Sequence, residues 1–147
     1  MKKVVVPNKD LIPEIARLVE DGTEVTFTPK GMSMLPFIRG ERDSVVLKKI
    51  SEVAVGDIVL AKLSDDRYVL HRIIGVDGDK VCLMGDGNIK GTEECLKGEI
   101  MAIAVRILKG DRTIDCNSPS HRRRAELWKL LMPLRRYLLA VYRRILK

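Results

Sequence analysis

The sequence lacks a long apolar run. Nowhere do about 18 apolar residues follow one another without a charge, so no segment has the composition of a membrane-spanning helix. The start, "MKKVVVPNKDLIPE", has only three apolar residues in a row before Pro7, too few for the hydrophobic region of an export signal. We therefore expect the protein to stay in the cytoplasm.

Cysteine is scarce. Cys82, Cys95 and Cys116 form an odd set without CxxC or Cys/His spacing. This pattern fits neither a disulfide framework nor a zinc site. We expect reduced thiols and no metal centre.

An excess of charge of one sign is missing from most of the chain. Residues 1–110 contain 17 Lys/Arg and 17 Asp/Glu, whereas residues 111–147 contain 10 and 3. The net charge of +7 therefore lies in the tail. A domain that wraps nucleic acid carries a basic surface on its body, so the sequence argues against nucleic acid as a partner.

The apolar residues that are present change period along the chain. Helical spacing over Asn8 to Asp21, with Asn8 as cap and Gly22 as stop, predicts a short N-terminal helix. Residues 23–106 form short β-rich runs such as "TEVTFTP" and "YVLHRIIGV", separated by turns such as "DGD" and "GDGN". We expect a mainly β fold: an antiparallel, partly closed β body.

The chain divides into three predicted parts: a β domain with its N-terminal helix at 1–110, a linker at 111–120, and a basic amphipathic helix at 121–147. We expect this helix to bend at Pro133. Its apolar positions recur at helical spacing: Leu127, Leu131, Leu134, Leu138, Val141 and Ile145.

A candidate nucleophile lies in "KGMSMLPFIRG", where Ser33 stands between two methionines, after Gly31 and before Pro36. A serine in a Gly/Pro turn is usually structural, and a catalytic serine needs a base. His71 in "RYVLHRIIGV" is the better placed of the two histidines, because a strand would hold it rigidly on the face of Val69 and Ile73. A core histidine with a structural hydrogen bond remains the alternative.

A histidine base also needs a carboxylate that fixes its tautomer. Asp86 in "MGDGNIKG" is the leading candidate, since it follows the next strand along and two glycines let its loop fold inward. Taken alone, Asp86 is better explained as a hairpin-turn residue that caps its own backbone. Asp77 and Asp79 of "GVDGDK" are the alternatives.

Four blocks in order, "GMSMLP", "VGDIVLAKL", "YVLHRII" and "MGDGN", resemble the signal-peptidase/LexA group of serine peptidases over about residues 25–105. "HRII" is most similar to the endoplasmic-reticulum and archaeal branch, whose base is a histidine. The resemblance implies Ser33 as nucleophile, His71 as base and Asp86 as the third member. It departs from that branch at Gly31, where the branch usually has a serine.

These assignments imply acyl transfer: His71 deprotonates Ser33, which attacks a peptide carbonyl, and water then hydrolyses the acyl-enzyme. Backbone N–H groups of Ser33 and Met32 are the expected oxyanion hole. The substrate would bind extended along a sheet edge, with Met34, and also Met32 and Phe37, lining the groove. No metal or organic cofactor is needed.

The expected substrate is a peptide or protein from which a leader or propeptide is cut. The basic tail, with Trp128, Tyr137 and Tyr142, fits an anionic membrane surface, which would make the protein peripheral on the inner face of the membrane. A helix docked on the β body or bound to a partner would explain the tail equally. Two rival functions remain: an inactive β-fold binding module and a LexA-like self-cleaving regulator.

Overall fold

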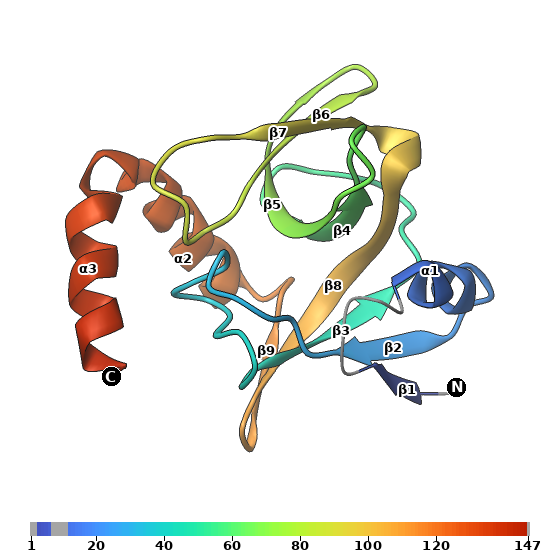
Figure 1. The fold of residues 1–147 in the computed structure, drawn as a ribbon, viewed down its shortest axis with the longest axis horizontal. Helices are drawn as coiled ribbons and strands as arrows, with labels where there is room; N and C mark the ends of the chain where they lie inside the picture. Colours follow the sequence, from blue (N-terminus) through green and yellow to red (C-terminus); the bar gives the residue numbers. More distant parts are fainter. Residues whose placement is uncertain (1–2, 7–11, 147) are drawn as a thin grey trace.

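One sheet dominates the computed structural model, which describes residues 3–6 and 12–146 (Figure 1). Within these residues the sheet has nine strands. They are β1 (Lys3–Val6), β2 (Glu24–Phe27), β3 (Ser44–Lys48), β4 (Ile58–Lys62), β5 (Tyr68–Asp77), β6 (Lys80–Met84), β7 (Glu93–Leu96), β8 (Ile100–Lys109) and β9 (Arg112–Asp115).

The strands lie in the order β1-β2-β3-β8-β4-β5-β6-β7, and β9 pairs with β8. All pairs are antiparallel except β1 and β2, which run parallel. The mainly antiparallel β fold predicted from the sequence is confirmed. The predicted partial closure is not seen, because the edge strands β1 and β7 do not pair with each other in the described part of the chain.

The predicted N-terminal helix is present as α1 (Ile12–Glu20). Its buried residues are Ile12, Ile15 and Val19, the apolar stripe expected from helical spacing. The helix ends before Gly22, whose φ of +89° is the left-handed conformation that glycine adopts at a helix end. The predicted cap, Asn8, lies outside the described residues.

The two faces of the sheet carry two separate core clusters. On β4, Ile58 and Leu60 pack in one cluster, while Val59 and Ala61 pack in the other. Successive strand residues point to opposite faces, so a strand buried on both sides contributes to two cores. This alternation governs which side chains of β5 meet in the candidate site.

The tail forms two helices rather than one: α2 (Pro119–Leu130) and α3 (Arg135–Ile145), joined by the 3-10 turn η3 (Met132–Leu134). The break falls at Pro133, where the sequence predicts a bend. The predicted linker, 111–120, contains β9 and the start of α2, which Ser118 caps by accepting a hydrogen bond from the backbone N–H of His121.

Both tail helices lie against one side of the sheet domain (Figure 1). A third cluster joins them to the loop that bears Ser33: Leu35, Trp128 and Leu139 are all buried there, with Tyr142 packed at the margin. The sequence predicts Trp128 and Tyr142 at a membrane interface; in the structure Trp128 is buried in this cluster and Tyr142 is half-buried beside it. None of the helices in residues 12–146 has the length and apolar character needed to cross a membrane.

Docking of α3 predicts a sharp contrast between neighbouring leucines. Leu139 is 1% exposed and Leu138 is 40% exposed. Leu139→Ala should lower the free energy of unfolding by about 2–5 kcal/mol, the usual cost of a cavity at a buried leucine. Leu138→Ala should change it by less than about 0.5 kcal/mol. Urea denaturation of both variants measures this, and equal values would contradict the docking of α3.

Candidate active site

Ser33 lies on the long loop between β2 and β3. Ser33 itself is exposed to solvent, whereas the next two residues, Met34 and Leu35, are buried and anchor the loop. Gly31 has φ +84°, a left-handed conformation that is costly for a residue with a Cβ atom. The glycine at this position, where the resembled branch has a serine, therefore follows from the backbone of this loop.

His71 lies on β5, opposite Val59 of β4, and is 6% exposed. It lines the same pocket as Ser33, a cavity of about 150 Å³ whose apolar wall includes Phe27, Leu60 and Leu70. The structure therefore brings the two predicted residues together, although 37 positions separate them in the sequence.

Gly85, directly after β6, lies close to both the backbone of Ser33 and the ring of His71. A Cβ atom at this position would lie 2.4 Å from the backbone oxygen of Ser33 and 3.1 Å from Nε2 of His71. Any side chain larger than hydrogen would push the two apart. The close approach of Ser33 and His71 to Gly85 thus explains one of the glycines of "MGDGN".

The other ring nitrogen of His71 is fixed by Glu93. Nδ1 donates to Oε1 of Glu93 over 2.7 Å, and the two side chains are 8% and 18% exposed. A carboxylate on Nδ1 places the neutral ring's proton there, which leaves Nε2 free to accept a proton from an alcohol. Nε2 is the nitrogen that faces Gly85, which also lies against the backbone of Ser33.

This arrangement has a counterpart among known families. The family model described as "Signal peptidase, peptidase S26" matches residues 23–120, which include the Ser33 loop, β5 and the loop after β6. The chain belongs to the signal peptidase family. A search of curated proteins finds no match. The family makes a peptidase function and a peptide or protein substrate the expectation for this chain.

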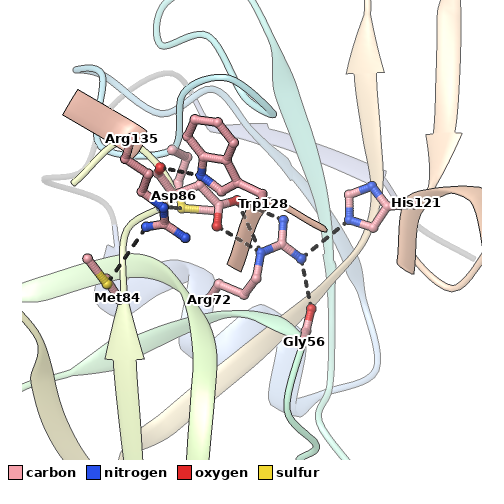
Figure 2. A network of polar contacts seen from close by, with 8 residues as sticks. Gly56, Arg72, Met84, Asp86, His121, Trp128 and Arg135 are labelled. Carbon is pink, nitrogen blue, oxygen red and sulfur yellow. Dashed lines mark hydrogen bonds and ion pairs between the residues drawn. The ribbon is translucent and has the colours of Figure 1, made fainter. Parts of the chain in front are cut away.

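The assignment of Asp86 as the partner of His71 needs correction in this signal peptidase-family chain. Asp86 pairs with Arg72, which points to the opposite face of β5 (Figure 2). Arg72 Nε donates to Oδ1 over 2.9 Å and Nη2 donates to Oδ2 over 2.7 Å. Both residues are at least 95% buried, so each neutralises a charge that would otherwise be costly inside the protein.

The alternatives Asp77 and Asp79 lie at the exposed turn between β5 and β6, where they pair no histidine. Asp86 and its neighbour Gly87 instead connect the Ser33 loop to other parts of the protein through hydrogen bonds of their backbone groups. Its backbone oxygen accepts a hydrogen bond from Trp128 Nε1 over 2.7 Å, and the N–H of Gly87 donates to the backbone oxygen of Ser33 over 2.8 Å. The loop 85–88 thus connects α2 to the Ser33 loop.

The sequence-based prediction does not include Glu93, because period-2 alternation places Glu93 on the face of Cys95 without showing which strand that face meets. Cys95 packs in the cluster that contains Ile73 and Val81, so its face of β7 is the face of β5 that bears His71. Glu93 stands two residues before Cys95 and therefore shares that face. The sequence-based prediction considers the Gly-bracketed loop and not the strand that follows it.

The remaining predicted residues divide between the pocket and its surroundings. Met34 lines the pocket, whereas Met32 is 45% exposed on the loop surface. Phe37 lies under the guanidinium of Arg72, 4.9 Å from it, and meets the ring of His121 edge-on. Met34 is thus the one of these three side chains that the structure places in the pocket.

His121, the second histidine, is buried beside Arg72, whose Nη1 lies 3.4 Å from its Nε2. Burial, together with the positive charges of Arg72 and Arg122, lowers the pKa of His121 to about 4. The ring is therefore neutral at neutral pH and accepts a hydrogen bond from Arg72. It serves the packing of α2 on the sheet, away from the Ser33 pocket.

The contacts of Asp86 predict that it acts on stability. Asp86→Asn should lower the free energy of unfolding by about 3–5 kcal/mol, because it leaves Arg72 charged and buried without a counter-charge. The matched control is Asp65→Asn, which removes an exposed pair with Arg67 and should change stability little. Urea denaturation compares them, and a wild-type midpoint for Asp86→Asn would contradict the structural role.

Proposed function

We propose that the protein is a serine endopeptidase that removes a leader or propeptide, with Ser33 as nucleophile, His71 as general base and Glu93 as the residue that orients the base. The observation that carries this proposal is the placement of His71: Nδ1 is held by Glu93, and Nε2 faces Gly85 in the pocket that Ser33 lines. Membership of the signal peptidase family supports it.

In the proposed reaction, Nε2 of His71 takes the proton of the Ser33 hydroxyl while Oγ attacks the carbonyl carbon of the substrate. The tetrahedral intermediate collapses, the C–N bond breaks, and His71 returns the proton to the leaving amine. A water molecule then repeats the sequence on the acyl-enzyme and releases the acid. Glu93 stabilises the imidazolium that forms in each half.

The hydroxyl and the ring form no hydrogen bond within the described residues, and Ser33 is exposed at the pocket rim. In free enzymes this bond is often long and tightens only when substrate binds. A peptide that fills the pocket would exclude water from Ser33, which favours rotation of its hydroxyl toward Nε2.

The oxyanion of the intermediate requires N–H donors without an acceptor of their own. The backbone N–H groups of Met32 and Ser33 form no backbone hydrogen bond among the described residues, whereas the oxygens of both residues accept one. This supports the assignment of these two N–H groups to the oxyanion hole. Each such donor contributes about 3–4 kcal/mol to the transition state.

An open strand edge borders the pocket and suits an extended peptide. Tyr68 to His71 pair with β4 on one side, but the pairing of β5 with β6 begins only at Arg72. Among the described residues no strand pairs with Tyr68, Val69 and Leu70 on the other side, beside the pocket that they line. A substrate strand would add to this edge, with one small side chain entering the cavity of about 150 Å³.

Two substitutions test the proposed catalytic residues through the rate of labelling by a fluorophosphonate probe. Ser33→Ala should abolish labelling, because the hydroxyl that attacks the probe is removed. Glu93→Gln should slow it by roughly a hundredfold or more, because the amide no longer fixes the tautomer or stabilises the imidazolium. Glu94→Gln, the exposed neighbour, is the matched control and should label at the wild-type rate.

Labelling of Ser33→Ala at the wild-type rate would contradict the assignment of Ser33 as nucleophile. Equal labelling rates for Glu93→Gln and Glu94→Gln would contradict the proposed role of Glu93. A folded wild-type protein that never labels would favour the inactive binding module. An internal cleavage product that accumulates on storage at alkaline pH, and is lost in Ser33→Ala, would favour the self-cleaving regulator.

A second property is proposed for α3: binding to an anionic membrane surface. One stripe of this helix and the turn before it remains exposed, with side chains between 40% and 72% accessible: Leu134, Tyr137, Leu138, Val141 and Ile145. Arg136, Arg143 and Arg144 are exposed on the same helix, and Glu126 is the single acidic residue of 121–147. An exposed apolar stripe among cationic side chains matches a surface of anionic headgroups over acyl chains.

Point substitutions on this stripe test membrane binding better than removal of the tail, since Trp128 and Leu139 belong to the core. Leu134→Glu with Val141→Glu should weaken flotation with phosphatidylglycerol vesicles roughly a hundredfold, because burial of two aliphatic side chains is worth about 3 kcal/mol. Leu96→Glu, at an exposed apolar residue of β7, is the control. Equal flotation of both proteins would remove the membrane proposal.

A further inference from the structure

A second cavity, of about 280 Å³, lies on the other side of β5 from His71, between the strand and α2. We call it the α2 cavity. Neither Ser33 nor His71 lines it. Its charged lining consists of the cations Arg72, Arg122, Lys129 and Arg135 and the carboxylates Asp86 and Glu126. Figure 2 shows three of these, Arg72, Asp86 and Arg135, close together.

Two of the four cations are neutralised. Asp86 offers both of its oxygens to Arg72, and Arg122 pairs with Asp57 over 2.6 Å. In the part of the chain that the structure describes, Lys129 donates only to the backbone oxygen of Ile74, over 3.3 Å. Glu126, an exposed residue, forms no ion pair within the described residues. Positive charge therefore exceeds negative charge around the α2 cavity.

Arg135 is the unusual member of this set. It is 2% exposed and forms no ion pair with a carboxylate of the described residues. Its Nη1 donates to the backbone oxygen of Asn88 over 3.2 Å and lies 3.7 Å from the sulfur of Met84. Its Nε has no acceptor in the described part of the chain.

A guanidinium in this environment favours an additional acceptor. Burial lowers the pKa of Arg135, although the negative charge of Asp86 partly offsets that effect. Arginine nonetheless stays protonated, so the charge remains and its desolvation is not balanced by a partner. The face of Trp128, 5.2 Å from the guanidinium carbon, supplies only a weak attraction.

We propose that the α2 cavity is a binding site for a phosphate group, with Arg135 and Lys129 as its principal ligands. A tetrahedral anion has enough oxygens to accept from the guanidinium of Arg135 and from the ammonium of Lys129 at once. The cavity is larger than phosphate alone and has room for a substituent on it. Inorganic phosphate, a soluble phosphomonoester and a phospholipid headgroup share this chemistry.

Thermal unfolding of the full-length protein tests the site, with sodium phosphate compared against sodium chloride at equal pH and ionic strength. Phosphate should raise the Tm of the wild type by roughly 3–8 °C at saturation. The matched control Arg136→Gln, at the exposed neighbour of Arg135, should show the same shift. Lys129→Gln should need roughly tenfold more phosphate for it.

Arg135→Met gives the sharpest result. In phosphate-free buffer its Tm should equal or exceed that of the wild type, because an apolar side chain replaces a buried cation that has no counter-charge. Phosphate should no longer shift it. If this variant does not fold, Lys129→Gln against Arg136→Gln decides alone, because Lys129 is exposed.

A second arm identifies the source of the phosphate. If inorganic phosphate produces the shift, the ligand is a free phosphate or a soluble ester. If only vesicles of phosphatidic acid and phosphatidylcholine stabilise the protein, and Lys129→Gln weakens that effect, the ligand is a lipid headgroup. Either outcome supports the site. Equal shifts in wild type, Lys129→Gln and Arg135→Met, or no shift with either probe, would overturn it.

Discussion

The buried ion pair between Arg72 and Asp86 is the constraint on which the rest of the structure depends. Arg72 neighbours His71 on β5, and Asp86 lies in the loop whose backbone meets Ser33. Two charges inside the protein are stable only while each keeps its partner in good geometry. The pair therefore locks β5 against the loop after β6, and with them the two residues proposed to carry the chemistry.

The ion pair also explains why the tail is part of the folded body. Trp128 of α2 donates to the backbone oxygen of Asp86, and Arg135 of α3 donates to that of Asn88 in the same loop. Leu35, two residues after Ser33, packs in one cluster with Trp128 of α2 and Leu139 of α3. Without α2 and α3, the buried pair and the Ser33 loop would both meet water.

Much of this architecture could be predicted from the sequence, because alternation on a strand is a local property. Period 2 on β5 predicts that His71 and Arg72 face opposite sides, and turn residues predict the hairpin between β5 and β6. Which carboxylate, Asp86 or Glu93, meets which face of β5 depends on the register between strands, which the local pattern does not show. Asp86 and Glu93 both follow β6, and only the pairing of β7 with β6 shows that Glu93 meets His71.

The tail shows the same limit in another form. Helical spacing correctly identifies an apolar stripe, but it does not tell whether that stripe or another face docks. In the structure most of the stripe stays exposed and Leu131 packs at the margin of the third cluster, while Trp128, Arg135 and Leu139, at other positions, are buried. Arg135 belongs to the predicted basic amphipathic helix at 121–147, and its burial involves contact with a loop almost fifty residues away.

Two consecutive residues of β5, His71 and Arg72, thus lie on opposite faces of the sheet and take part in different sites. His71 faces the pocket with Ser33 and Glu93, and Arg72 faces the α2 cavity with Asp86 and His121. Because β5 pairs with β4 at both His71 and Arg72, the backbone positions of these two neighbouring residues are fixed relative to each other. Since α2 and α3 form the outer wall of the second face, whatever stabilises these helices against the sheet also stabilises the geometry of the proposed nucleophile and base. The C-terminal helices are therefore a structural component of the site, even though none of their residues lines the pocket of Ser33.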